Sequence, residues 1–105
     1  MSLEKTLLMN ELFDCYQGLL TKKQREMLAL YYKEDFTLAE IAEHYDISRQ
    51  GVHDNIRRGE ESLENYEAMI QLNHLRKVKY RLLKQLKETE LTDEQSDIIS
   101  QLEEL

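Results

Sequence analysis

Proline is absent from this 105-residue sequence, and glycine occurs only three times, at Gly18, Gly51 and Gly59. Sheets of many strands need tight turns, which are built mostly from glycine, proline and asparagine. Because these turn formers are scarce, we predict an all-α fold. The length suits one ordinary domain with a modest core and some appendages.

Cysteine and long hydrophobic runs are also scarce. The single cysteine, Cys15, cannot form an internal disulfide. The first twenty residues contain Glu4, Glu11 and Asp14 instead of the basic start and apolar run of a secretory signal. No apolar stretch approaches the roughly 20 residues that a membrane-spanning helix needs. We therefore expect a soluble cytoplasmic protein without a membrane span.

The usual residue patterns of catalytic and cofactor sites are missing too. His44, His53 and His74 do not have metal-ligand spacings such as HExxH, and no glycine-rich phosphate loop occurs. Glu40 and His44, four residues apart, are interpreted as a pair on a helix surface. Cys15 lies on an apolar helical stripe, which favours a buried structural thiol over a nucleophile. We predict no catalysis, no cofactor and no metal site.

Positive charge is confined to part of the chain. The formal net charge is −7, which by itself disfavours a general nucleic-acid binder. Residues 68–87, however, contain six lysines and arginines and no acid. The neighbouring segments 59–67 and 88–105 contain four and seven acids, and neither contains a base. Charge is therefore segregated into blocks, of which 76–87 is strongly basic.

Capping patterns predict where several helices begin. In a capping box, a threonine hydroxyl accepts from the third amide beyond it, and a Glu or Gln there reaches back to the threonine amide. Three pairs fit this pattern: Thr21 with Gln24, Thr37 with Glu40, and Thr92 with Gln95. Ser48 is a good N-cap for a further helix. Helical spacing continues over 59–87, and a shift of its apolar stripe predicts a break between residues 66 and 74, with Asn73 as the candidate position.

Residues 37–58 have the pattern of a helix-turn-helix. That motif needs a short first helix, a tight turn and a second helix whose outer face can enter a groove, with apolar residues fixing the crossing angle. The predicted inner side comprises Leu38, Ile41, Ala42, Ile47, Val52 and Ile56. The predicted outer side of the second helix carries Arg49, Gln50, His53, Asp54 and Arg57.

Residues 20–63, reading LTKKQREMLALYY and then TLAEIAEHYDISRQGVHDNIRRGEESL, resemble region 4 of bacterial sigma-70-type factors. The N-terminal LFDCYQGLL and the long charged C-terminal extension are unlike a sigma factor and are similar to the YlxM-type family of small bacterial proteins. This resemblance implies a DNA-binding regulator associated with the signal recognition particle pathway. We expect a helix-turn-helix domain with an additional N-terminal helix over 1–66, and a long helical extension over 67–105, basic over 76–87 and acidic over 88–105.

Carried over by position, the resemblance assigns phosphate contacts to Thr37, Ser48, Arg57 and Arg58, and base-edge or backbone contacts to Arg49, Gln50 and His53. Asp54 would oppose phosphate there unless it accepts from a cytosine amine or pairs with Arg57 or Arg58. Residues 21–58 contain seven bases and seven acids, which favours weak or assisted DNA binding. The alternatives are a solvated helix face without a ligand, and a module that docks on a protein of the signal recognition particle pathway.

The basic block is a second candidate for nucleic-acid binding. Its Arg76, Lys77, Arg81 and Lys84 would bind phosphate, with the particle RNA as a possible ligand. Alternatively, the block pairs with the acidic residues 88–105, from the same chain or from a second subunit. A regular apolar stripe on this helix packs on the N-terminal helices or against another copy, and comprises Leu75, Val78, Leu82 and Leu86. We expect a homodimer, which would present two recognition helices.

Overall fold

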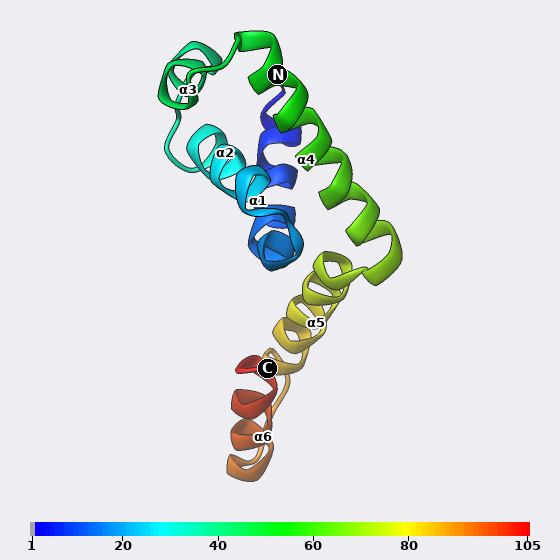
Figure 1. Cartoon of the computed structure of the whole chain (residues 1–105). Helices are drawn as coiled ribbons and strands as arrows, with labels where there is room; N and C mark the ends of the chain where they lie inside the picture. The colour runs from blue at the N-terminus through cyan, green and yellow to red at the C-terminus, as the bar shows by residue number, and fades with distance from the viewer. Residues whose placement is uncertain (1) are drawn as a thin grey trace. The chain divides into compact units, whose positions relative to one another are not determined.

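The computed structural model describes residues 2–105, which form two compact helical units, one ending at Gln71 and the other spanning Leu72–Leu105. The helices, labelled in Figure 1, are α1 (Leu3–Tyr16), α2 (Lys22–Tyr32), α3 (Leu38–Tyr45), α4 (Arg49–Ile70), α5 (Leu72–Lys87) and α6 (Asp93–Glu103). A turn of 3₁₀ helix at Gln17–Leu19 follows α1. No strand occurs among the described residues, so the predicted all-α fold is confirmed.

The predicted helix starts are confirmed by side-chain caps. Thr21, Thr37 and Thr92 each accept a hydrogen bond from the third amide beyond them, at 3.2, 3.1 and 3.1 Å, and all three capping boxes are complete. Ser48 Oγ accepts from the Gly51 amide at 3.0 Å and caps α4. These bonds satisfy first-turn amides that have no partner within the helix, and each cap is typically worth about 1 kcal/mol.

The predicted break after the helix-turn-helix is confirmed, but its position is Gln71, not Asn73. Gln71 has a φ of 56°, in the left-handed region that side-chain-bearing residues rarely adopt. Its amide still donates to the Glu67 carbonyl at 2.9 Å, which closes the last turn of α4. Asn73 lies inside α5. The first unit therefore extends beyond the predicted boundary at residue 66, because α4 continues to Ile70.

The core of the first unit lies between α4 and the helices α1, α2 and α3, all of which pack against it. Figure 1 shows α4 running alongside this group. Of the predicted inner side of the helix-turn-helix, Leu38 and Ile47 are half-buried. The buried apolar side chains are Met9, Leu12, Phe13, Tyr16, Leu20, Met27, Leu28, Tyr32, Ile41, Ala42, Val52, Ile56 and Leu63.

Helices α2 and α4 are in close contact at Gly59. A Cβ atom at this position would lie 2.7 Å from Leu28 Cδ1 and 3.2 Å from Leu28 Cγ. The Leu28 side chain is completely buried, so little space is open to it. Glycine is therefore required here by the contact between the helices, although it is a poor helix former.

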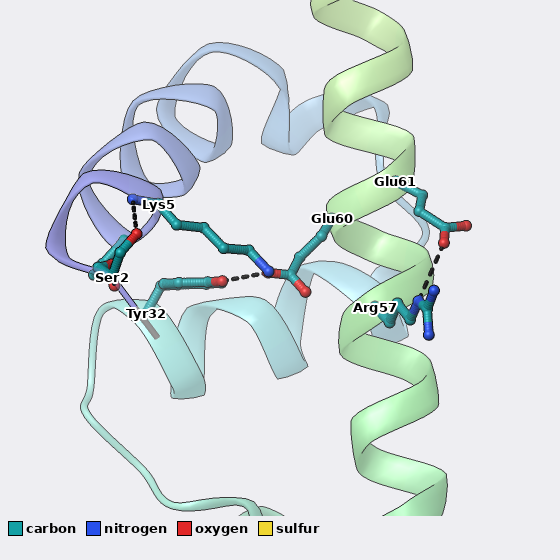
Figure 2. A network of polar contacts seen from close by, with 7 residues as sticks. Ser2, Lys5, Tyr32, Arg57, Glu60 and Glu61 are labelled. Atoms are coloured by element: carbon teal, nitrogen blue, oxygen red, sulfur yellow. Dashed lines mark hydrogen bonds and ion pairs between the residues drawn. The ribbon is translucent and has the colours of Figure 1, made fainter.

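A buried carboxylate joins α4 to α1 and α2 (Figure 2). Glu60 on α4 accepts a hydrogen bond from the Tyr32 hydroxyl of α2, and its Oε2 atom lies 3.5 Å from Lys5 Nζ of α1. Only 9% of Glu60 is exposed. Burial, together with the Glu60 carboxylate, raises the pKa of Tyr32 far above its ordinary value. The network anchors α4 one turn beyond Arg57.

We expect this tyrosine to make the protein less stable at alkaline pH. Because its pKa is higher in the folded chain than the ordinary 10.0, the folded protein keeps a proton that the unfolded chain releases above pH 10. Below that pH Tyr32 adds no pH dependence, and above it the free energy of unfolding should fall by up to about 1.4 kcal/mol per pH unit.

Urea denaturation at about pH 9 and about pH 11 measures this effect. The loss of stability between the two should be smaller in Tyr32→Phe than in the wild type. Tyr80→Phe removes a hydroxyl from an exposed ring and should behave like the wild type. If Tyr32→Phe and wild type lost equal stability, the expected role of Tyr32 would be wrong.

In the second unit, α5 and α6 form a helical hairpin. Leu83 and Ile99 are its buried apolar side chains. Lys87 Nζ lies 2.6 Å from Glu103 Oε2, and Lys79 Nζ donates to the Leu105 carbonyl at 2.9 Å. The basic and acidic blocks were predicted to pair either within one chain or between two subunits. The ion pair of Lys87 with Glu103 is a pairing within one chain.

Candidate nucleic-acid interface

The outer side of α4 presents polar side chains over its first three turns. Arg49, Gln50, His53, Arg57 and Arg58 are all exposed, in contrast to the buried apolar residues on the opposite side of the helix. This two-sided arrangement follows from the helical period, because residues three or four apart share a face. The structure thus brings these predicted site residues together on one helix.

The two predicted hydroxyl contacts lie at helix starts. Thr37 caps α3 and Ser48 caps α4, and both residues are exposed. Each hydroxyl accepts from a backbone amide of its own helix and can still donate its proton to a phosphate oxygen. The first amides of α4 and the helix dipole also favour an anion at this end.

Carboxylates compensate part of the charge on this face. Arg57 Nε lies 3.4 Å from Glu61 Oε1. Figure 2 draws this ion pair on α4. Asp54 Oδ1 accepts from Gln50 Nε2 at 3.0 Å and lies 3.7 Å from His53 Nδ1. Among the described residues, Asp54 therefore pairs with neither Arg57 nor Arg58, one of the two possibilities that the sequence left open. Arg57 instead pairs with Glu61, one turn further along the same side of α4.

These contacts are weak enough to be exchanged for a ligand. The side chains of Arg57 and Glu61 are 70% and 61% exposed, and exposed ion pairs contribute only about 0–1 kcal/mol. Charge-assisted hydrogen bonds from arginine to phosphate are stronger than this. Arg49 and Arg58 form no ion pair within residues 2–105, so their guanidinium groups can bind a ligand without losing one.

A hollow of about 510 Å³ lies beside the outer side of α4. Its lining residues are Lys5, Tyr31, Leu38, His53, Ile56, Arg57 and Glu60. Sequence reasoning missed Lys5, because only the packing of α1 against α4 brings this residue near His53 and Arg57. It also missed Glu61, although the spacing of four residues from Arg57 was a usable signal.

The second predicted set of nucleic-acid-binding residues lies on α5, in the second unit. It is described separately from the set on α4, which belongs to the first unit. Arg76, Lys77, Arg81 and Lys84 are exposed there. Arg81 and Lys84 form no ion pair in the part of the chain that the structure describes. Lys84 lines a small hollow of the hairpin together with Tyr80, Lys87 and Glu103.

The described residues contain no group of three His, Cys, Asp or Glu side chains that could hold a metal ion. Glu40 and His44 form no ion pair among the described residues, and the Glu40 carboxylate accepts from the Thr37 amide at 3.0 Å. The His44 ring instead packs edge-on against Tyr45. Cys15 is half-buried on α1.

Over residues 2–105, no helix combines the length and apolar character needed to cross a membrane.

Comparison with known proteins identifies relatives of the whole chain. Residues 3–104 match the model of the UPF0122 family, described as "Putative helix-turn-helix protein, YlxM / p13 like". A UPF0122 protein of an Exiguobacterium species is 51% identical over 106 residues, covering 100% of this chain and 99% of the relative. A UPF0122 protein of Bacillus pumilus is 48% identical over 109 residues, with the same coverage. One of Bacillus velezensis is 61% identical over 72 residues, covering 69% and 66%.

The family is described by its helix-turn-helix, a motif of nucleic-acid-binding proteins, and not by an enzymatic activity. The match spans both the first unit with its outward arginines and the α5–α6 hairpin. With this coverage and these identities, the chain belongs to the UPF0122 family of YlxM / p13-like helix-turn-helix proteins.

Proposed function

We propose that this protein is a regulator that binds DNA through the outer side of α4 and performs no catalysis. One observation carries the proposal. Arg49, Gln50, His53 and Arg57 are exposed together on one side of a helix whose other side is held by the core of the first unit. A helix presented in this way fits the major groove, which is about 12 Å wide.

The first turns of α4 would make the base contacts. Its 22 residues give a length of about 33 Å, so most of the helix lies outside the groove. Arginine pairs with guanine through two hydrogen bonds, and glutamine pairs with adenine in the same way, which suits Arg49 and Gln50. Thr37, Ser48 and Arg58 would hold phosphate. Arg57 would exchange Glu61 for phosphate.

Charge limits the affinity of a single copy. Bases and acids are equal in number over residues 21–58, and the whole chain has a net charge of −7. We therefore propose that the protein works as a homodimer in the cytoplasm, with two recognition helices on one DNA duplex. The protein would share the helix-turn-helix motif with region 4 of sigma factors. It would differ in needing a second copy to bind DNA.

Removal of two arginines tests the proposal. The Arg49→Ala/Arg57→Ala variant should bind a random-sequence DNA duplex at least about tenfold more weakly, because two guanidinium groups no longer neutralise phosphate. The slope of log affinity against log salt should also fall by about 1–2. Fluorescence anisotropy with a labelled duplex, between about 50 and 200 mM salt, measures both quantities.

Lys22→Ala/Lys23→Ala is the matched control for this test. It removes the same amount of charge from exposed positions on α2, and its affinity should stay within about twofold of the wild type. Thermal unfolding followed by circular dichroism should show both variants folded. Equal affinity of wild type and Arg49→Ala/Arg57→Ala would overturn DNA binding by this side of α4.

A second candidate function is protein docking, in the signal recognition particle pathway that the resemblance suggests. The observation in its favour is the pair of carboxylates, Asp54 and Glu61, on the outer side of α4. A pull-down from nuclease-treated lysate separates the two functions. A protein that is retained by the wild type and lost with Asp54→Lys would support docking. RNA that is recovered without nuclease and lost with Lys77→Ala/Lys84→Ala would instead assign RNA binding to α5.

A further inference from the structure

A carboxylate lies among the outward side chains of α4, where it opposes the phosphate groups of DNA. Asp54 follows Gln50 by one helical turn, and the helical period places both residues opposite the buried Val52. The Asp54 side chain is 46% exposed. Its Oδ1 atom accepts from Gln50 Nε2 at 3.0 Å and lies 3.7 Å from His53 Nδ1. The hydrogen-bond partner of this carboxylate is therefore a glutamine of the predicted recognition set.

The carboxylate decides which way the Gln50 amide points. A glutamine amide has an oxygen that only accepts and an NH₂ group that only donates, whereas an ionised carboxylate only accepts. The NH₂ group is therefore the end of the amide that faces Asp54, at a distance of 3.0 Å. Because the amide is planar, its carbonyl oxygen must then point away from Asp54. Without the carboxylate, the exposed Gln50 side chain would be free to rotate.

The orientation that Asp54 imposes on Gln50 matches adenine better than the other bases. One N–H of the amide is used by Asp54, which leaves one N–H donor beside one carbonyl acceptor for a ligand. Adenine presents the complement in the major groove, because its N7 atom accepts and its N6 amine donates. Guanine presents two acceptors, N7 and O6, and the remaining N–H can satisfy only one of them. Cytosine and thymine each present a single polar group there.

Building on the DNA binding by α4 that is proposed above, we propose that Asp54 is a positioning residue that holds the Gln50 amide for adenine. Asp54 contacts Gln50 and not the DNA. Its negative charge weakens the binding of every sequence alike, because it repels phosphate. Its hydrogen bond favours only sequences with adenine, because a glutamine that is already oriented loses less conformational freedom on binding. The two effects of this carboxylate have opposite signs, so they can be measured separately.

Binding-site selection from random DNA duplexes, with the full wild-type chain, supplies the sequence for the test. It should return a position at which adenine is preferred, and Gln50→Ala should lose this preference. Asp54→Asn has the same shape as the wild type, but its amide also donates, so it can face either end of the Gln50 amide. The ratio of affinities for adenine and guanine at this position should fall about three- to tenfold in Asp54→Asn. Its affinity for a random-sequence duplex should not fall, because a negative charge has been removed.

Glu61→Gln is the matched control for Asp54→Asn. It also replaces a carboxylate on the outer side of α4 by the amide of the same shape, but this carboxylate contacts Arg57 and not Gln50. Its affinity for a random-sequence duplex should not fall either, and its ratio of affinities for adenine and guanine should stay within about twofold of the wild type. Asp54→Glu keeps a group that only accepts, so it should retain most of the preference for adenine. Fluorescence anisotropy with labelled duplexes measures these affinities.

Two different failures are distinguishable in this experiment. A wild type that binds DNA through α4 without a preference for adenine would overturn the role of Asp54 and leave the proposed function standing. A preference that Asp54→Asn leaves intact, or that Glu61→Gln removes equally, would do the same. A wild type that binds no duplex would overturn the proposed function, and the role of Asp54 with it.

Discussion

Replacement of Gly59 by valine should lower the free energy of unfolding by about 3 kcal/mol, the upper end of what overpacking a core costs. Valine adds a Cβ atom 2.7 Å from Leu28 Cδ1 and two methyl groups beyond it. Leu28 is completely buried, so it has little room to turn away, and either its side chain or the spacing of α2 and α4 must change. Because α4 is the helix that presents the outward arginines, its displacement would also change the angle of the recognition face.

Urea denaturation followed by circular dichroism measures this loss. Gly18→Val is the control, because a Cβ at Gly18 has no atom within 4 Å and should change stability by less than about 0.5 kcal/mol. The Gly59→Val/Leu28→Ala double variant should lose less free energy of unfolding than the sum of the losses of the two single variants, since Leu28→Ala removes the atoms that clash. If Gly59→Val were as stable as the wild type, the two helices would not be held together at this contact.

Glu60 and Tyr32 should behave as one unit when they are substituted. Glu60→Met should cost about 2–3 kcal/mol, because it removes the buried carboxylate to which the Tyr32 hydroxyl donates. Tyr32→Phe should cost about 2 kcal/mol, because the buried carboxylate loses its hydrogen bond and keeps only Lys5. The double variant replaces both polar groups by apolar ones, so it should cost clearly less than the sum of the two single variants.

A double-mutant cycle measured by urea denaturation tests this coupling. The interaction energy between the two positions should be about 1–3 kcal/mol. Glu61→Met supplies the control, since Glu61 is the next residue but is exposed, and its loss should cost less than about 1 kcal/mol. Strict additivity of Glu60→Met and Tyr32→Phe would show that the two side chains do not depend on each other.

The parts of the fold that were predicted correctly depend on short-range chemistry. The caps at Thr21, Thr37 and Thr92 join residues three apart, so the sequence alone contains both partners of each bond. The helix-turn-helix was predicted because its apolar residues recur at helical spacing. The break was predicted within the right range, but its candidate position was Asn73 instead of Gln71, because glutamine has no particular preference for the left-handed region and nothing local distinguishes it from its neighbours.

The features of the site that were missed depend on packing between distant parts of the chain. Lys5 and Tyr32 meet Glu60 only after α1 and α2 have packed on α4, so no local pattern contains all three. Partners on the outer side of α4 are a different case. Arg57 has carboxylates at three and at four positions away, and side-chain geometry decides that Glu61 is the one it contacts. The roles of these residues toward a ligand stay predictions.

On helix α4, substitutions that change the outer side are independent of substitutions that change the core. Positions such as Val52 and Leu63 face the core, and Gln50 and Arg57 alternate with them along the same hydrogen-bonded backbone. Substitution of the outward set need not disturb the inward set, because the helical period keeps them on opposite sides. Relatives could therefore diverge in what they recognise while keeping the same scaffold. The outward residues of another helix-turn-helix protein could likewise be transplanted onto this one.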